Sequence, residues 1–319
     1  MSRAKLVSRV DLSSHVAWLS ISKGCENKGN LLIEHALKKL LKLERIAVSP
    51  SAFSALTPAM ISRVNSCRVL LLPGSTLLDP GEYPALDALG RISCNKLAIG
   101  VAFCSHDGKV DLSVARGIDL PIGSRDPFTH RRLRAAGIKS EFVGCPTLFL
   151  GRASTWKHNA GPLVISLGLG SQRELQECVK ACARFGDVVL VEHVPRLQPM
   201  FPLPERVRRV AISSAAQAIE LYAAAGAVLT GRLHAFLTCL SLGVPVMFFG
   251  AWSDSRFSLL EYLGVKQEQP EPRRIAKLAE ASLNGKSPST RCLERAERLR
   301  KAMLDFLASF EIEANSACS

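Results

Sequence analysis

The chain has 319 residues, of which 47% are hydrophobic, so a disordered chain is excluded and a large buried core is expected. At about 150 residues per domain, this length indicates two domains. Lysine and arginine outnumber aspartate and glutamate by 41 to 28, and the resulting net charge of +13 suits an anionic partner. Only 6% of the residues are aromatic, which argues against a protein that stacks single-stranded nucleic acid on aromatic rings, so no nucleic-acid partner is expected.

The first half of the chain alternates short apolar segments with amphipathic ones. Strands are predicted at residues 16–21, 68–73, 97–102 and 118–122, and helices at 31–41 and 127–136. A polar turn over residues 23–30 joins the first strand to the first helix, and Gly137 is expected to end the second helix.

The second half repeats this alternation after a stretch without periodicity. That stretch, from Gly151 to Gly161, is the predicted boundary between an N-terminal domain of residues 1–155 and a C-terminal domain of residues 156–319. Strands are predicted at 163–167, 187–192, 227–230 and 244–249, and helices at 171–185, 214–225, 233–242, 254–263 and, as an interrupted tail, 272–310. Continuous apolar strands between helices predict an α/β fold of parallel sheets, whose ligands bind at the carboxyl ends of the strands.

The cysteines and the start of the chain bear on the cellular compartment. Four of the ten cysteines, Cys67, Cys104, Cys145 and Cys239, lie in or beside apolar runs, where a thiol behaves as a small hydrophobic group. There is no C-x-x-C pair, so no zinc site is expected. His106 stands alone in the sequence and is expected to be a structural or a surface residue. The first residues lack an apolar signal core, and no apolar run reaches the roughly 18–20 residues of a membrane span. A cytoplasmic protein with reduced thiols is therefore predicted.

The segment from Thr230 to Ala235 is the strongest candidate for chemistry. A predicted strand ends at Thr230, Gly231 makes the turn, and Arg232, Leu233 and His234 open a helix. Unpaired N–H groups and the partial positive charge of a helix N-terminus bind anions, and a guanidinium adds a bidentate grip on carboxylate or phosphate. His234 is then a candidate proton donor or acceptor. The alternative is structural, with the arginine paired to a glutamate and the histidine capping the turn.

Three further segments follow predicted strands. Asn27 to Asn30 offers amide groups for sugar hydroxyls or an anion, and its structural alternative is a simple turn with a helix cap. Arg125 and Asp126 end a strand and open a helix, with a structural Arg–Asp pair as the alternative. Glu192 and His193 could serve acid–base chemistry, although a single pair of this kind is weak evidence.

These segments resemble, in order, the motifs of the polysaccharide pyruvyl transferase family. The stretch AVLTGRLHAFLTCLSLGVPV from Ala227 to Val246 resembles its signature, and WSDSRFSLLEYLG from Trp252 to Gly264, which contains Arg256, resembles its sequel. The weaker matches are Asn27–Asn30 with an N-x-G-D turn, Leu70–Ser75 with a strand that ends in glycines, Arg125-Asp126 with an R-D motif, and Gly144–Pro146 with G-D-P. The similarity covers about residues 20–265.

The resemblance implies a GT-B-like fold of two Rossmann-like domains, with the acceptor on the N-terminal side and the donor on the C-terminal side. It implies transfer of pyruvate from phosphoenolpyruvate to a sugar as a cyclic ketal, with no metal and no cofactor other than the donor. Arg232 and His234 are then the catalytic candidates. The substrate-binding candidates are Arg125, Gly231, Leu233, Arg256, Asn27, Asn30, Gly74, Ser75, Glu192 and His193. The acceptor is a saccharide of a polysaccharide or its lipid-linked precursor, which places peripheral contact with the inner face of the membrane among the expectations.

The chain departs from the family pattern at three places. Asn30 and Cys145 stand where the family has aspartates, and Pro73-Gly74-Ser75 replaces a glycine triplet. Three functions therefore stay open: a pyruvyl transferase, a GT-B-type glycosyltransferase that uses a nucleotide sugar, and a non-catalytic relative in polysaccharide assembly. Arg232 and His234 argue against the last of these, whereas Asn30 and Cys145 argue for it.

Overall fold

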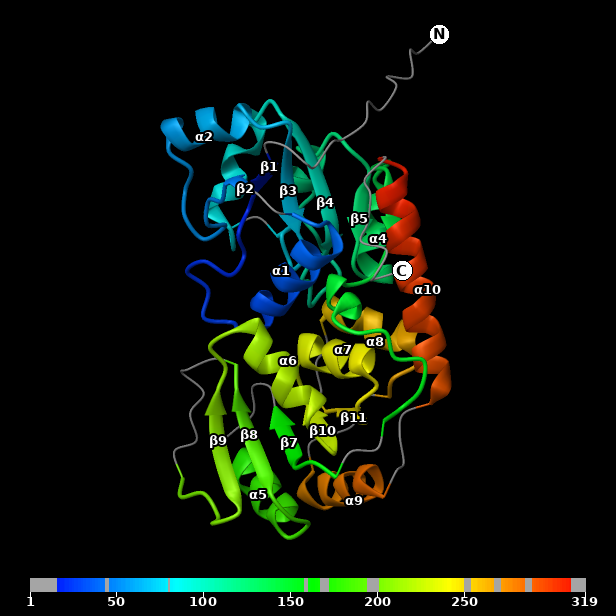
Figure 1. The fold of residues 1–319 in the computed structure, drawn as a ribbon. Coiled ribbons are helices and arrows are strands. Elements are labelled where there is room, and N and C mark those ends of the chain that lie inside the picture. The colour runs from blue at the N-terminus through cyan, green and yellow to red at the C-terminus, as the bar shows by residue number, and fades with distance from the viewer. Residues whose placement is uncertain are drawn as a thin grey trace.

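Two parallel β-sheets flanked by helices form the protein in a computed structural model (Figure 1). The structure describes residues 16–43, 46–79, 81–157, 160–166, 172–193, 201–249, 254–266, 271–284 and 289–310. No helix within these ranges is both long and apolar enough to cross a membrane.

The first sheet contains six parallel strands in the order β2-β1-β3-β4-β5-β6. Its strands are β1 (Val16–Trp18), β2 (Ile46–Val48), β3 (Val69–Pro73), β4 (Asn95–Val101), β5 (Ile122–Ser124) and β6 (Ser140–Phe142). Its helices are α1 (Gly29–Leu40), α2 (Pro58–Asn65), α3 (Ser113–Arg116) and α4 (Pro127–Ala135), with 3-10 helices η1 (Pro84–Arg91) and η2 (Pro146–Phe149). The strand order reverses between β1 and β3, which is where doubly wound sheets bind ligands.

The second sheet contains five parallel strands in the order β11-β10-β7-β8-β9. Its strands are β7 (Leu163–Ser166), β8 (Val188–Glu192), β9 (Val207–Ala211), β10 (Ala227–Thr230) and β11 (Val246–Phe248). The helices after β7 are α5 (Gln172–Ala183), α6 (Ala215–Ala223), α7 (Leu233–Leu242), the 3-10 helix η4 (Ser255–Phe257), α8 (Ser258–Leu263), α9 (Pro272–Leu283) and α10 (Thr290–Ala308). The strand order reverses between β7 and β10.

The predicted alternation of strands and helices is confirmed, with corrections at particular positions. The strand predicted at 118–122 is wrong over most of its length, because β5 begins only at Ile122, after Pro121, which has no N–H to donate to a neighbouring strand. Likewise β11 begins after Pro245 and is shorter than the predicted strand. The start of the predicted helix 171–185 falls at Ser171, outside the described residues.

The C-terminal helix α10 packs back onto the first sheet, beside β5 and α4 (Figure 1). Phe306 is fully buried against Gly123, where an added Cβ would lie 2.9 Å from its ring. Arg300 donates from Nε to the carbonyl of Leu148 at 2.7 Å. The helical tail is therefore confirmed, and it joins elements from both halves of the chain, while the division at residues 155 and 156 stays a prediction.

Hydrogen bonds also join the loops of the two sheets. The Lys28 amide donates to the carbonyl of His193 at 3.0 Å, and the Ser255 amide donates to the carbonyl of Ser105 at 2.8 Å. The first of these contacts brings the start of α1 to the end of β8. The ends of strands from both sheets therefore meet in one region.

Candidate functional site

The turn from β10 to α7 is fixed by bonds to the neighbouring strand β7. The Gly231 amide donates to the carbonyl of Ser166 at 3.2 Å, and the Thr230 hydroxyl donates to the same carbonyl at 2.7 Å. The Arg232 amide in turn donates to the Thr230 hydroxyl at 3.0 Å. Since β7 and β10 flank the point where the strand order reverses, this turn lies where a parallel sheet binds its ligand.

Arg232 is the N-cap residue of α7, and its side chain makes no capping bond. The guanidinium is half-buried and forms no hydrogen bond or ion pair with any described residue, so the Arg–Glu pair of the structural alternative is not formed there. Burial lowers the pKa of Arg232, while the nearby Tyr222 raises it. A partly buried and unpaired guanidinium at a helix N-terminus favours an anionic ligand.

His234 lies two residues after Arg232, in the first turn of α7, and it packs against Gly29 at the start of α1. An added Cβ on Gly29 would lie 2.8 Å from Nδ1 of His234, so only a glycine fits there. Nε2 of His234 is buried without a hydrogen-bond partner among the described residues. Burial, followed by the charges of Arg125, lowers the pKa of His234 to about 3, and His193, Arg256 and Arg232 act in the same direction. The imidazole is therefore neutral at pH 7.

His193, at the end of β8, is a second buried histidine in the same region. Its Nε2 lies 2.5 Å from the Tyr222 hydroxyl, and its Nδ1 has no hydrogen-bond partner among the residues described. Burial, and then the charge of Arg232, lower the pKa of His193 to about 3. This histidine is thus also neutral, and its Nδ1 is available to a ligand.

Arg125 follows β5 of the first sheet, and Arg256 lies in η4 after the second sheet. Carboxylates neutralise the two guanidinium groups to different extents. Arg125 is 1% exposed, and its Nε lies 3.5 Å from Asp126, but Nε and Nη2 are buried without a hydrogen bond to the described part of the chain. Arg256 instead donates from Nε and Nη2 to the carboxylate of Asp254 at 2.8 and 2.7 Å. That bond raises the pKa of Arg256.

Asp126 mainly caps α4 and accepts from the Thr129 amide at 2.9 Å. Burial raises the pKa of Asp126, while the charge of Arg125 lowers it. Arg125 is also close to Cys145, which is buried and accepts from the Thr147 hydroxyl. Because Cys145 stands where the resemblance places an aspartate, Arg125 lacks the carboxylate that an aspartate would place near it.

Asp79 is a residue that the sequence reasoning missed. It follows β3, and its carboxylate accepts from the Cys104 amide at 2.7 Å. The pKa of Asp79 is raised to about 7, mainly by burial and also by the charge of Glu82, while the Cys104 amide and the charges of Arg125 and Arg256 act against this rise. A single aspartate in a loop belongs to no motif that could be recognised in the sequence. Its position near these arginines is therefore seen only in the folded chain.

The remaining N-terminal candidates mainly build the loops around the site. The Asn27 side chain accepts from the Gly29 amide at 3.1 Å, and Asn30 donates to the carbonyl of Ile21 at 2.9 Å. Gly74 has a φ of 61°, and an added Cβ would lie 2.7 Å from Ile33. Ser75 has a φ of 63° and lies 3.5 Å from Asn30 through its hydroxyl.

Glu192 faces away from this cluster toward the edge strand. Its carboxylate lies 3.0 Å from Nε of Arg209, on the neighbouring strand β9. Arg125, Arg232, Arg256, His193 and His234 thus come together, whereas Glu192 forms a structural pair. Within the described ranges, only Cys104, His106 and Asp254 lie close enough to share a metal ion.

A family model of polysaccharide pyruvyl transferase matches residues 27–253, more than half of the chain. The chain belongs to the polysaccharide pyruvyl transferase family. Every site residue predicted from the sequence, except Arg256, lies within the matched range. A sequence comparison with curated proteins gives no match.

Solved structures of sugar-nucleotide epimerases share the fold. A putative UDP-N-acetylglucosamine 2-epimerase from Listeria monocytogenes is 12% identical, with a TM-score of 0.59 over 93% of this chain and 95% of that chain. UDP-GlcNAc 2-epimerase from Methanocaldococcus jannaschii is 12% identical, with a TM-score of 0.56 over 90% and 99%. The likeness shows the fold alone, and it confirms the predicted α/β class of two Rossmann-like sheets in a GT-B-like arrangement.

The neutral state of His193 predicts a pH-dependent stability of this family member. The pKa of His193 is lowered from its usual value near 6.5 to about 3, so the unfolded chain binds the extra proton between these values. The stabilisation from the neutral His193 is fully present above about pH 6.5. As the pH falls below that value, the free energy of unfolding decreases by up to about 1.4 kcal/mol per pH unit. In urea unfolding, the free energy of unfolding should fall less between pH 7 and pH 5 in His193→Gln than in the wild type.

The comparison with the variant is needed because Asp79, whose pKa is raised, acts with the opposite sign. Identical pH slopes in the two proteins would contradict the assignment of a neutral, buried His193.

Proposed function

We propose that the chain transfers pyruvate from phosphoenolpyruvate to two hydroxyls of a sugar, forming a cyclic ketal and releasing phosphate. One observation carries the proposal: the charges of Arg125 and Arg232 both act on the neutral His234, and described residues leave Arg125 only partly paired and Arg232 without a side-chain partner. Phosphoenolpyruvate carries a carboxylate and a phosphate on the same small carbon skeleton. Two separate cations beside one proton carrier match that distribution of charge.

In this proposal Arg232 and the backbone around Gly231 and Leu233 hold one anionic group of the donor. Arg125 holds the other, with Arg256 beside it. Preorganised cations stabilise charge that develops in the transition state without reorganising at the moment of reaction. The donor's negative charge also offsets the cations that lower the proton affinity of His234.

His234 starts neutral and is therefore the proton acceptor. It takes the proton of the first sugar hydroxyl as that oxygen attacks the central carbon of the donor, and it returns a proton to the methylene carbon, which becomes a methyl group. The second hydroxyl then attacks the same carbon, the bond from carbon to phosphate oxygen breaks, and the second proton leaves with the phosphate. The sum is two new carbon–oxygen bonds to the sugar and one inorganic phosphate, with no cofactor other than the donor.

The acceptor is expected on the side of α1 and the loop after β3. The exposed Asn27 lies beside Gly29 and His234, and the Asp79 carboxylate lies near Arg125 and Arg256. Amide and carboxylate groups hydrogen-bond sugar hydroxyls. We place the acceptor hydroxyls between these two groups and His234.

Activity is tested by phosphoenolpyruvate-dependent phosphate release across a panel of soluble and lipid-linked saccharides. Arg232→Ala and His234→Gln should each reduce turnover by about 100-fold or more, because each removes charge stabilisation or proton transfer. The exposed Arg208→Ala, on the edge strand β9, is the matched control and should keep wild-type turnover. Near-wild-type activity in either site variant, with circular dichroism showing folded protein, would sink these assignments.

A nucleotide-sugar transferase is the second candidate, because solved structures of the same fold include one bound to a nucleotide sugar. This is UDP-GlcNAc 2-epimerase from Neisseria meningitidis bound to UDP-GlcNAc, which is 10% identical, with a TM-score of 0.53 over 91% of this chain and 99% of that chain. The family match favours pyruvyl transfer. Nucleotide release without phosphate release from phosphoenolpyruvate would favour this second candidate, and neither release on any saccharide would favour a non-catalytic relative.

The net charge of +13 supports a further part of the proposal, peripheral contact with an anionic membrane that carries a lipid-linked acceptor. Sedimentation with vesicles that contain anionic lipid should retain the protein at low salt and release it at high salt, since the attraction is screened. Equal binding to neutral vesicles, or none at low salt, would contradict this contact.

A further inference from the structure

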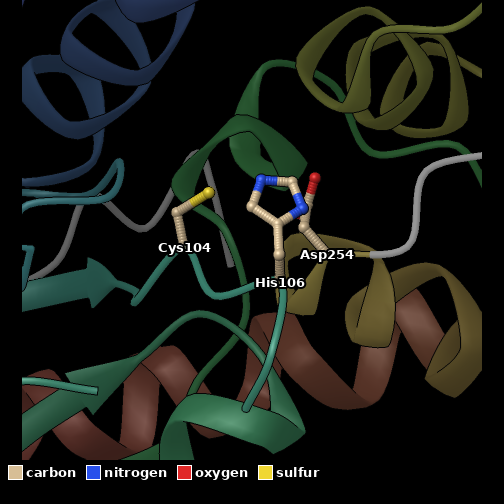
Figure 2. Close-up of side chains that lie close together, drawn as sticks. All are labelled: Cys104, His106 and Asp254. Carbon is tan, nitrogen blue, oxygen red and sulfur yellow. The ribbon is translucent and has the colours of Figure 1, made fainter. Parts of the chain in front are cut away.

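Three side chains of metal-ligating type lie together beside the proposed site (Figure 2). Cys104 and His106 come from the loop after β4, and Asp254 precedes the 3-10 helix η4. The Cys104 sulfur, a His106 ring nitrogen and an Asp254 oxygen all lie within 4.8 Å of one another. Asp254 is about 150 positions from Cys104 and His106 in the sequence, so the fold brings it to them.

The two segments that carry these ligands are tied to each other by hydrogen bonds. The Ser255 amide donates to the Ser105 carbonyl at 2.8 Å, and the Ser105 amide donates to the Ser255 hydroxyl at 2.9 Å. The Ser255 hydroxyl donates in turn to the Phe103 carbonyl at 3.1 Å. Because Ser105 lies between Cys104 and His106, and Ser255 follows Asp254, these bonds fix the backbone of all three ligands in advance.

Asp254 keeps room for a ligand although it binds Arg256. Its Oδ1 accepts from the amide and Nε of Arg256, and among the described residues its Oδ2 accepts only from Nη2 of Arg256. A carboxylate offers about four lone-pair positions, so one position on Oδ2 remains available. Metal-bound carboxylates usually accept hydrogen bonds from a neighbouring group, and Arg256 would be that group.

We propose that Cys104, His106 and Asp254 bind one zinc ion, with water as the fourth ligand. A thiolate, an imidazole and a carboxylate suit Zn²⁺, whereas Mg²⁺ and Ca²⁺ prefer oxygen ligands alone. Tetrahedral ligands at Zn²⁺ lie about 3.4–3.8 Å apart, so the side chains need to close by about 1 Å. His106 is exposed and Cys104 is only half-buried, so neither side chain is locked in a packed core and the closure is small enough for side-chain rotation.

The site goes beyond the proposed transfer of pyruvate, because no step of that reaction uses the metal. The ion would join the loop after β4 to the segment before α8, and so link the two halves of the chain next to Arg256. It would hold Asp254, and through it the guanidinium of Arg256, in one position. The proposal differs from the expectation that this chain has no zinc site, because that expectation could only weigh spacing along the sequence.

Zinc binding is measured on untagged full-length protein that has been stripped with a chelator, given excess Zn²⁺ and dialysed. Elemental analysis should find one zinc per chain in the wild type, and Co²⁺ in its place should show the absorption band of a thiolate ligand. Cys104→Ser and His106→Ala should bind Zn²⁺ at least tenfold more weakly and lose that band or weaken it. Added Zn²⁺ should raise the melting temperature of the wild type and not that of Cys104→Ser.

Two matched controls separate this site from adventitious binding. Cys25→Ser removes another half-buried thiol, and His35→Ala removes another exposed imidazole, and both should keep one zinc per chain. Zinc retention in Cys104→Ser equal to that of the wild type, loss in all variants alike, or no zinc in the wild type would each overturn the proposal. None of these readouts depends on enzymatic activity, so the result stands apart from the fate of the proposed function.

Discussion

Buried positive charge without full neutralisation is the constraint on which the rest of the site depends. Arg125 is almost completely buried, yet two of its nitrogens have no hydrogen bond to a described residue. The half-buried side chain of Arg232 likewise has no partner in the part of the chain that the structure describes. Leaving a buried charge only partly paired costs stability. A fold tolerates that cost where a ligand of opposite charge completes the pairing, and the proposed anionic donor would be such a ligand.

Burial and, after it, the same charge determine the protonation state of the histidines. The rings of His193 and His234 are withdrawn from solvent and lie near cations, so both are neutral, and each has one ring nitrogen without a partner among the described residues. Contacts between the two sheets hold them in place: the amide of Lys28 binds the carbonyl of His193, and Gly29 packs against His234. The start of α1 is therefore part of the candidate site. Asn30, which was predicted to bind the substrate, instead donates a hydrogen bond to the carbonyl of Ile21.

The central elements of the fold were predictable because burial on both faces makes their strands continuously apolar. β10 follows that rule, and α7 comes directly after it. A turn after a central strand of a parallel sheet is a binding position, so the same pattern located Arg232 and His234. The edge strand β9 was missed because Arg208 and Arg209 interrupt its apolar pattern. The edge strands β2 and β6, of three residues each, are too short to show a period.

The partners of the site residues were not predictable, since they depend on distances between remote segments. The pairing of Glu192 with Arg209 follows from the order of β8 and β9 in the sheet, and the places of Asp79 and Cys104 follow from loops that meet only after folding. The substitution of Cys145 for a family aspartate was visible in the sequence. Its consequence, an arginine without that carboxylate, required the structure.

The claim that the unsatisfied arginines receive a doubly anionic donor is tested most directly by calorimetric titration of phosphoenolpyruvate into the wild type and Arg125→Met. A hydrogen bond to a charged group contributes about 1.5–3 kcal/mol, so the variant should bind at least about tenfold more weakly while its circular dichroism shows a folded chain. Equal affinity in the two proteins, or a wild type that binds UDP-sugars and not phosphoenolpyruvate, would contradict the account.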